Sequence, residues 1–341
     1  MIDFIPLVVV RSITYNHASF IEDAMNGFCM QRTSFPFVCT IIDDCSTDGE
    51  PAVIENYLQK HFDLDDSSIV RNEETEDYIL TFARNKTNKN CYFAVYYLKY
   101  NHYSTGNNSR KDEYIKEWFE QVKYVAFCEG DDYWTDLDKL QKQVSFLEKH
   151  PDYSMCTHVA LWERNGKLYK AGCQHSKECT LSSDEVIRFG GLYLATASLV
   201  FRKELADDWP KWRKLSDVGD YPLQILGTLR GGMHYFPEPM CVYRFQYPGS
   251  WTNRDSCVIN THHLKTEIAW MKVLDEDTCY VYTDAIYSHL IQFYSTLYLA
   301  KQLSFADYYG AYKRTSALSF KRFFKDVLIK NFNWLYKLIK K

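Results

Sequence analysis

Short apolar runs that alternate with helical patterns constrain the fold of this chain more than any other feature of its sequence. Leu7–Val10 and Phe37–Ile42 are apolar and rich in β-branched residues, which is typical of buried strands. Helical spacing of apolar residues follows the first run at Ser19–Gln31 and the second at Ile54–Phe62. Because strand and helix alternate, the strands should be parallel and joined by right-handed crossovers.

The same criteria predict further elements as far as Pro151, which should end a helix. The expected elements are strand fragments at Ile69-Val70 and Ile79-Leu80, a strand at Phe93–Leu98, a helix at Lys111–Gln121, a strand at Tyr124–Cys128 and a helix at Leu137–His150. This order predicts an α/β fold with a Rossmann-like, mainly parallel sheet flanked by helices.

Two acidic clusters directly follow two of the predicted strands. Asp43-Asp44 ends the second apolar run, and Glu129-Gly130-Asp131-Asp132 follows Tyr124–Cys128. Open parallel sheets bind ligands in the crevice outside the carboxyl ends of their strands. We therefore expect both clusters to meet at one edge of the sheet and to form a single site.

The chemistry of the second cluster suits a divalent cation. Glu129 and Asp131 alternate along an extended chain, so both side chains should point the same way, with Asp132 adjacent. Mg²⁺ or Mn²⁺ usually takes one or two protein carboxylates together with the phosphates of a substrate. Acids after a strand are also common in solvated turns, so the cluster alone leaves both roles open.

The run Phe127–Gln143 continues from this cluster into Asp-Tyr-Trp and then Lys-Leu-Gln-Lys-Gln. It resembles the large family of inverting glycosyltransferases with the GT-A fold, the family 2-like type of bacterial surface-polysaccharide synthesis. That family carries an Asp-x-Asp-type motif followed by Asp-Tyr or Asp-Trp and a Lys-Leu-x-x-Gln helix. Ser12–His17 and Ile42–Gly49 are similar to its first-strand signature and its Asp-Asp-x-Ser-x-Asp-Gly segment. The resemblance implies a GT-A domain.

The resemblance also implies which residues contact a nucleotide-sugar donor. Thr14, Tyr15 and Asn16 would line the nucleotide, and Asp43 and Asp44 would lie at its base, with Asp44 accepting a hydrogen bond. A carboxylate only accepts hydrogen bonds, which suits a ring N–H or a ribose hydroxyl. The alternative role for both acids is capping of the following helix.

In the second cluster, the resemblance implies that Asp131 ligates the metal and that Glu129 contacts the ribose or the metal. Asp132 would support them at the donor. The usual motif begins with Asp, whereas this chain has Glu129, which is one methylene longer. Asp131 is therefore the firmer candidate for the metal ligand.

An inverting transferase needs a general base to take the proton of the acceptor hydroxyl. The family usually draws this Asp from the start of a helix in the second half, and Ser216–Gln224 has the matching form. Asp220 is the expected base and Asp217 is the alternative. Both could instead cap the helix expected at Tyr221–Leu229.

The segment Phe236–Arg244 looks like the family strand that leads back to the active site. Arg244 would pair with the donor diphosphate through charge-assisted hydrogen bonds. A structural ion pair is an equally good interpretation of this arginine. Gly249–Thr252, which follows, is expected to be a mobile loop.

Cysteine usage and charge limit the class of protein. The eleven cysteines are scattered without a Cys-x-x-Cys pair, which favours free thiols in a reducing cytoplasm. Cys173-x-His175-x-x-x-Cys179 lacks a fourth ligand at zinc spacing. The formal net charge is −4 although residues 311–341 carry nine Lys and Arg and one acid. The remainder is therefore acidic, which argues against binding of nucleic acid.

Residues 320–341 predict a basic amphipathic helix. Such a helix could lie in an anionic membrane surface, dock on the acidic body or pair with a second subunit in a homo-oligomer. We expect no segment that spans a bilayer, and a location in the cytoplasm or at the inner face of the plasma membrane.

The sequence therefore predicts a GT-A domain at residues 1–250 and a helical region at 251–341. The expected reaction moves one sugar from a nucleoside-diphosphate sugar, UDP-linked, to a glycan or lipid-linked glycan, with inversion and with Mg²⁺ or Mn²⁺. The alternatives are a catalytically silent nucleotide-sugar or glycan-binding module and a nucleotidyl transferase. A nucleotidyl transferase would need a Gly-rich phosphate loop after the first strand. Thr14-Tyr15-Asn16-His17 stands at that position and contains no glycine.

Overall fold

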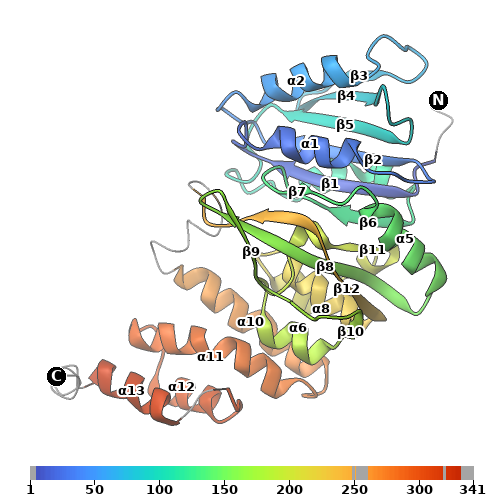
Figure 1. Ribbon diagram of the computed structural model, residues 1–341. Helices are drawn as coiled ribbons and strands as arrows, with labels where there is room; N and C mark the ends of the chain where they lie inside the picture. Colours follow the sequence, from blue (N-terminus) through green and yellow to red (C-terminus); the bar gives the residue numbers. More distant parts are fainter. Residues whose placement is uncertain (1–4, 248–249, 251–259, 318–319, 332–341) are drawn as a thin grey trace. The chain divides into compact units, whose positions relative to one another are not determined.

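The computed structural model describes residues 5–247, 250, 260–317 and 320–331 (Figure 1). The chain forms two compact units. The first consists of Met1–Thr180, Leu194–Asp207 and Arg230–Ser250, and the second of Leu181–Tyr193, Asp208–Leu229 and Trp251–Lys341.

A sheet of twelve strands, counted over the described residues, forms the first unit, in the order β10-β12-β8-β11-β6-β1-β2-β5-β4-β3 with β7 beside β12 and β9 beside β8. The strands are β1 (Val8–Thr14), β2 (Phe37–Asp43), β3 (Arg71–Glu74), β4 (Tyr78–Arg84), β5 (Cys91–Leu98), β6 (Tyr124–Phe127), β7 (Tyr133–Trp134), β8 (Tyr153–Arg164), β9 (Lys167–Lys170), β10 (Cys179–Leu181), β11 (Val200–Arg202) and β12 (Gly232–Arg244). The neighbours β6, β1, β2 and β5 are parallel, whereas β11 and β4 flank them in antiparallel orientation. The predicted, mainly parallel α/β sheet is confirmed.

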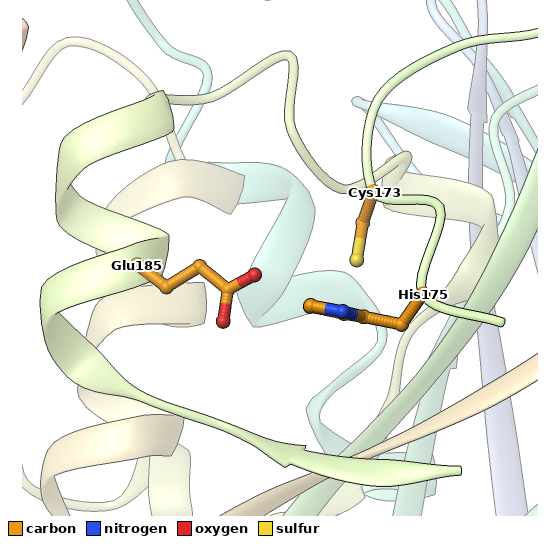
Figure 2. Close-up of side chains that lie close together, drawn as sticks. All are labelled: Cys173, His175 and Glu185. Carbon is orange, nitrogen blue, oxygen red and sulfur yellow. The ribbon is translucent and has the colours of Figure 1, made fainter. Parts of the chain in front are cut away.

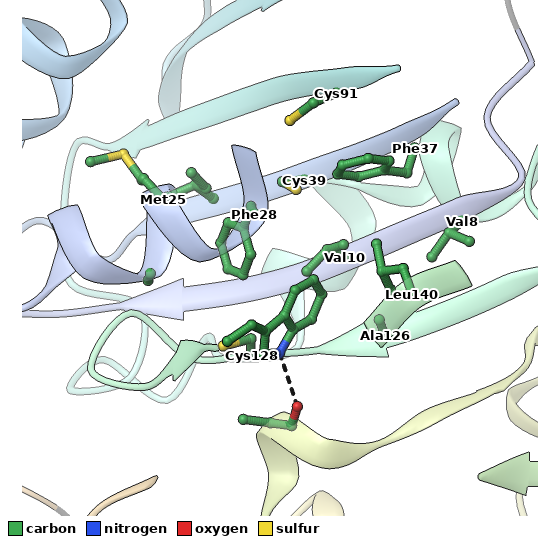
Figure 3. Close-up of a cluster of buried hydrophobic side chains, with 14 of the residues drawn as sticks. Val8, Val10, Met25, Phe28, Phe37, Cys39, Cys91, Ala126, Cys128 and Leu140 are labelled. Atoms are coloured by element: carbon green, nitrogen blue, oxygen red, sulfur yellow. Dashed lines mark hydrogen bonds between the residues drawn. The ribbon is translucent and has the colours of Figure 1, made fainter. Parts of the chain in front are cut away.

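One face of this sheet carries the main core of the first unit. The helices of the unit are α1 (Ile21–Cys29), α2 (Glu50–His61), α3 (Arg110–Tyr114), α4 (Lys116–Phe119) and α5 (Lys139–Lys149), with short 3-10 turns η1 (Thr196–Ser198) and η2 (Lys203–Ala206). Figure 3 shows Phe28 of α1 and Leu140 of α5 beside Val10 of β1 and Cys39 of β2, all in one buried cluster. Alternate strand residues supply this face because side chains alternate along a strand.

On the opposite face, α4 covers part of β4 and β5. Trp118 stacks on Phe82 with ring centroids 4.9 Å apart, and its indole N–H donates a 2.9 Å hydrogen bond to the hydroxyl of Tyr96. All three side chains are buried. Side chains on both faces of β1 and β2 are buried, which explains why these strands read as continuous apolar runs.

Most predicted elements of the first unit are confirmed to within a few residues, and two are not. The single helix expected at Lys111–Gln121 is two short helices, α3 and α4, because Ile115 leaves helical geometry at φ −95° and ψ 5° and is fully buried. The fragment Ile69-Val70 precedes β3 rather than forming it, whereas Ile79-Leu80 lies inside β4.

The second unit is helical. Its helices are α6 (Ser183–Phe189), α7 (Lys211–Leu215), α8 (Asp220–Leu229), α10 (Thr261–Asp277), α11 (Thr283–Leu299), α12 (Phe305–Tyr312) and α13 (Phe320–Asn331). Glu267 of α10 accepts a 2.8 Å hydrogen bond from the indole of Trp270 and lies 3.3 Å from Nε2 of His289 on α11. The ring of His289 in turn packs on Tyr221 of α8. The predicted division at residue 250 therefore differs from these units, because residues 181–193 and 208–229 pack with the C-terminal helices.

The described part of the predicted amphipathic tail is α13, and it packs within the second unit. Phe323 stacks on Tyr312 with ring centroids 4.4 Å apart, and buried Asp326 accepts 2.7 Å hydrogen bonds from Ser295 and Tyr308. Residues 332–341 lie outside the described residues, and membrane contact of the tail stays a prediction. None of the helices in the described ranges has both the length and the apolar character needed to cross a membrane.

Two helical glycines should respond to alanine with opposite sign. In Gly27→Ala on α1 the new Cβ would lie 2.9 Å from the backbone nitrogen of Trp134, whereas in Gly310→Ala on α12 it would meet no atom within 4 Å. Alanine gains about 1 kcal/mol over glycine in a helix, but a clash with backbone costs about 1–3 kcal/mol. We expect urea denaturation to show that Gly27→Ala lowers the free energy of unfolding and that Gly310→Ala raises it. Equal effects of the same sign would contradict the close contact between α1 and β7.

Candidate active site

The two acidic clusters lie on either side of the carboxyl end of β1. The backbone N–H of Asp44 donates to the carbonyl of Thr14, and that of Gly130 donates to the carbonyl of Ile13, each at 3.0 Å. β1 is the strand between β2 and β6. The prediction that both clusters meet at one edge of the sheet is thus confirmed.

Gly130 permits the close approach of the second cluster to β1. A Cβ on this residue would lie 2.2 Å from Oγ1 and 2.5 Å from Cβ of Thr14. Such distances are far inside van der Waals contact, so a side chain here would push the two segments apart. The glycine between Glu129 and Asp131 is therefore required by packing and not by backbone conformation.

Glu50, the first residue of α2, ties the loop after β1 to the loop after β2. Its carboxylate is buried and accepts hydrogen bonds from the hydroxyl of Thr14, from the backbone N–H of His17 at 2.8 Å and from the hydroxyl of Ser46 at 2.8 Å. Three donors from two loops converge on one carboxylate. Thr14, predicted to line a nucleotide, thus takes part in the internal network that shapes this edge.

Asn16 adds a second link between the same loops. Its backbone adopts φ 58°, its N–H donates to the hydroxyl of Ser46 at 2.8 Å, and its side-chain carbonyl accepts from the N–H of Thr47 at 2.8 Å. Tyr15, between Thr14 and Asn16, is partly exposed. Of the three residues predicted at the nucleotide, Thr14 and Asn16 hold the loop, and their donor contacts stay a prediction.

Asp44 holds the segment that follows β5. Its carboxylate accepts from the backbone N–H groups of His102 and Tyr103 at 2.7 and 3.1 Å and forms a 2.7 Å ion pair with Lys111, whose side chain is, like that of Asp44, 2% exposed. Burial lowers the pKa of Lys111, and the charge of Asp44 opposes that effect. The structure gives Asp44 this internal role, while its contact with a base stays a prediction.

Asp43, the last residue of β2, is buried beside like charges. Burial raises the pKa of its carboxyl to about 6, and the neighbouring Glu50 and Asp44 push in the same direction, whereas hydrogen bonds from Ser46 oppose them. A carboxyl with such a pKa gains and loses its proton near neutral pH.

Asp132 is fully buried and anchors the second cluster to β12. One carboxylate oxygen accepts a 2.9 Å hydrogen bond from the backbone N–H of Arg244, and the other has no hydrogen-bond partner among the described residues. Burial raises the pKa of Asp132 well above the usual range, and the charge of Asp131 adds to this. The predicted supporting acid is therefore a buried link whose second oxygen is unsatisfied.

Arg244 is enclosed by acids and aromatic rings. Its guanidinium donates to the backbone carbonyl of Asp131 at 2.7 Å, pairs with Asp23 and lies between the rings of Phe20 and Tyr133 at 4.7 and 4.6 Å. The side chain is only 10% exposed. These contacts match the structural ion pair that the sequence left open, and contact with a diphosphate stays a prediction.

Asp131 and Glu129 are the acids of this cluster that reach solvent. Glu129 is exposed, and the side chain of Asp131 is 14% exposed. One oxygen of Asp131 accepts a 2.6 Å hydrogen bond from the hydroxyl of Tyr247 and lies 4.0 Å from Nε2 of His17. No pattern in the sequence indicated Tyr247, and His17 was included only as part of the family-like motif.

These donors fit a hard divalent cation. Asp131 and Glu129 offer carboxylate oxygens at the solvent side of the cluster, and Asp132 leaves an unsatisfied buried oxygen behind them. Mg²⁺ and Mn²⁺ take such oxygen ligands and usually keep several water or phosphate ligands as well. Asp131 is the residue best placed to hold the ion.

The predicted catalytic acids belong to the second unit. Asp220 is the first residue of α8, and its carboxylate accepts a 2.8 Å hydrogen bond from the N–H of Tyr221. Asp217 forms a 2.9 Å pair with His263. The base role of Asp220 stays a prediction. In the loop predicted at Gly249–Thr252, Gly249, Trp251 and Thr252 lie outside the described residues.

Figure 2 labels three side chains whose types can bind metals. Cys173 and His175 lie on the segment between β9 and β10 in the first unit, and Glu185 lies on α6 in the second unit. A structural zinc site takes four ligands, and the first unit contributes two of these three side chains. They supply no argument about the site at the end of β1.

Comparison with known proteins gives distant relatives. No family model matches the chain. Uncharacterized protein Rv1520 of Mycobacterium tuberculosis (strain ATCC 25618 / H37Rv) is 29% identical over 252 residues, which cover 71% of this chain and 60% of that protein. The putative teichuronic acid biosynthesis glycosyltransferase TuaG of Bacillus subtilis (strain 168) is 28% identical over 167 residues, 49% of this chain and 52% of TuaG. The chain thus spans less than two thirds of the length of either relative.

Among solved structures, the crystal structure of S. aureus TarS 1–349 in complex with UDP is similar to this chain. The TM-score is 0.56 at 15% sequence identity, and the match covers 88% of this chain and 76% of the other. At this identity the likeness concerns the fold. The predicted GT-A fold class is confirmed.

The raised pKa of Asp43 predicts a pH-dependent effect of removing its charge. The folded-state pKa of about 6 lies above the ordinary value of 3.8, so the folded chain binds more protons between these values and loses stability as the pH rises through them. Relative to wild type, Asp43→Asn should therefore gain about 2 kcal/mol between pH 4 and pH 7.5 in urea denaturation. Asp65→Asn, at an exposed carboxylate, is the control. An equal effect of Asp43→Asn at both pH values would contradict the raised pKa of the buried Asp43 carboxyl.

Proposed function

We propose that this chain is a glycosyltransferase that moves one sugar from a nucleoside-diphosphate sugar, UDP-linked, to a glycan or lipid-linked glycan acceptor with inversion. The observation that carries the proposal is the convergence of Asp43-Asp44 and Glu129–Asp132 at the end of β1, on a GT-A fold. A diphosphate leaving group needs its charge neutralised, and hard cations held by carboxylates do this. The likeness to TarS and to TuaG agrees with this chemistry.

On the donor side, Asp131 would hold Mg²⁺ or Mn²⁺, with Glu129 at the ribose or the ion. The bound ion would neutralise the charge that develops on the diphosphate as the sugar leaves. Tyr15 is partly exposed and lies in the loop after β1, which hydrogen bonds join to the loop after β2. There it would pack on the base. The ion pair of Asp44 with Lys111 holds the segment after β5 at the same edge of the sheet.

On the acceptor side, a carboxylate must accept the proton of the attacking hydroxyl while the new bond forms opposite the leaving group. Asp220 is the proposed base because it begins a helix, as in the family that the sequence resembles. An acceptor at the inner face of the plasma membrane would suit an enzyme with a basic tail, and the packing of α13 leaves Phe320 and Phe324 67% and 50% exposed.

Removal of the proposed metal ligand tests the donor half of the reaction. Wild-type chain should release UDP slowly from UDP-sugars in the presence of Mn²⁺, and Asp131→Ala should lower this rate by about a hundredfold or more. Asp207→Ala, at a half-exposed acid paired with Lys203, should leave it unchanged. A panel of UDP- and GDP-sugars, read by nucleotide release, identifies the donor. Binding without turnover across the panel and candidate acceptors would favour a silent binding module instead.

Removal of the proposed base tests the acceptor half. Asp220→Asn should keep donor affinity but lower transfer about 10²- to 10⁴-fold, because it removes the proton acceptor without changing the shape of the residue. Asp217→Asn, at the acid paired with His263, is the matched control. Transfer that survives in Asp220→Asn and disappears in Asp217→Asn would move the role to Asp217.

A further inference from the structure

The hydroxyl of Tyr247 lies between two groups that commonly bind metals. It is 2.6 Å from the Oδ2 of Asp131 and 3.0 Å from the Nε2 of His17, and these two atoms are 4.0 Å apart. The three distances make the angle at the hydroxyl oxygen close to a right angle. A right angle between neighbouring ligands is the geometry around an octahedral ion.

An ion at this point would need a modest closure of its ligands. Ligands at about 2.1 Å from an octahedral ion and at a right angle to each other are about 3 Å apart. The observed separation of Asp131 and His17 is 4.0 Å. The two side chains would therefore move together by about 1 Å when an ion replaced the hydroxyl.

The hydrogen bonds of His17 direct its Nε2 toward this point. The hydroxyl of Thr14 donates its proton to Glu50, so toward the Nδ1 of His17, 3.1 Å away, it can only accept. Nδ1 of His17 therefore donates to Thr14. The Tyr247 hydroxyl likewise donates its proton to Asp131, so it can only accept from Nε2. When that hydroxyl leaves and Nε2 releases its proton to solvent, the lone pair of Nε2 becomes available to an ion. The backbone N–H of His17 also donates to Glu50, which holds the main chain of this residue in place. This arrangement orients the ring as partners of metal-binding histidines do.

We propose that His17 is a metal ligand beside Asp131, and that the Tyr247 hydroxyl keeps the position of the ion in the metal-free chain and leaves it when the ion binds. The proposal rests on the metal site of the proposed function. Tyr247 lies three residues after Arg244, the last residue of β12. Its ring packs on that of Phe20, with ring centroids 4.9 Å apart. Ion binding would thus release the side chain that follows β12.

The proposed ligand pair also selects the ion. Mg²⁺ prefers oxygen ligands, whereas imidazole nitrogen suits first-row transition metals, whose affinity generally rises along the series from Mn²⁺. One carboxylate and one imidazole should therefore favour Mn²⁺ over Mg²⁺.

Direct measurement of Mn²⁺ binding to the full chain without nucleotide tests the proposal, using the electron paramagnetic resonance signal of free Mn²⁺. We expect His17→Ala to raise the Kd for Mn²⁺ about tenfold or more and to reduce the preference for Mn²⁺ over Mg²⁺. Tyr247→Phe should lower the Kd about three- to tenfold, because the ion no longer displaces a hydrogen-bonded hydroxyl. His17→Gln serves as a second variant if His17→Ala does not fold, as judged by thermal melting.

His150→Ala and Tyr169→Phe, at exposed residues of the same unit, are the matched controls and should leave the Kd unchanged. An unchanged Kd in both His17 variants would overturn the ligand role, and a raised Kd in Tyr247→Phe would show that the hydroxyl is a ligand and not a stand-in. A wild-type chain that binds no Mn²⁺ would overturn the whole inference. Metal-dependent donor hydrolysis that survives in the His17 variants would leave the proposed function standing, whereas Mn²⁺ binding through His17 without hydrolysis of any donor would remove the proposed function alone.

Discussion

The candidate site depends on a few backbone hydrogen bonds at the carboxyl end of β1. The carbonyls of Ile13 and Thr14 accept from Gly130 on one side and from Asp44 on the other, so one strand end places both acidic clusters. The carboxylate of Glu50 then fixes the loops that leave this edge. Because the crossovers of a parallel sheet return every strand in the same direction, the sheet itself delivers these loops to one edge. The chemistry of the site thus follows from the sheet topology.

The sequence predicts those parts of the structure that local pattern encodes. The strands and the acids that end them are visible because buried parallel strands are apolar throughout. The contacts of Glu50, Lys111 and Tyr247 are not visible, since each joins residues far apart in the chain: 36 positions from Thr14, 67 from Asp44 and 116 from Asp131. The break at Ile115 and the packing of residues 181–193 and 208–229 with the C-terminal helices likewise depend on tertiary contacts.

The acids of the site divide into those that hold the structure and those that face solvent. Asp44 and Asp132 are buried and bonded to backbone N–H groups, as is typical of carboxylates that position a segment. Asp131 and Glu129 are the acids of the second cluster that a ligand can reach. The resemblance to a family assigns these acids to the donor and the metal. The structure adds an internal role for Asp44 and Asp132, and their donor contacts stay predictions. Arg244 also has an internal role, because its guanidinium donates to Asp23 and to the carbonyl of Asp131.

This division has an electrostatic consequence. Burial and the charges of Asp131 and Glu129 raise the pKa of Asp132, so ionisation of all three acids carries an electrostatic cost. Arg244 lowers that cost, because its backbone N–H donates to Asp132 and its positive charge lies nearby. A divalent cation at Asp131 would offset the remainder, and an ion that binds only the folded chain also stabilises the fold. The acidic cluster therefore carries the negative charge that the proposed cation would neutralise.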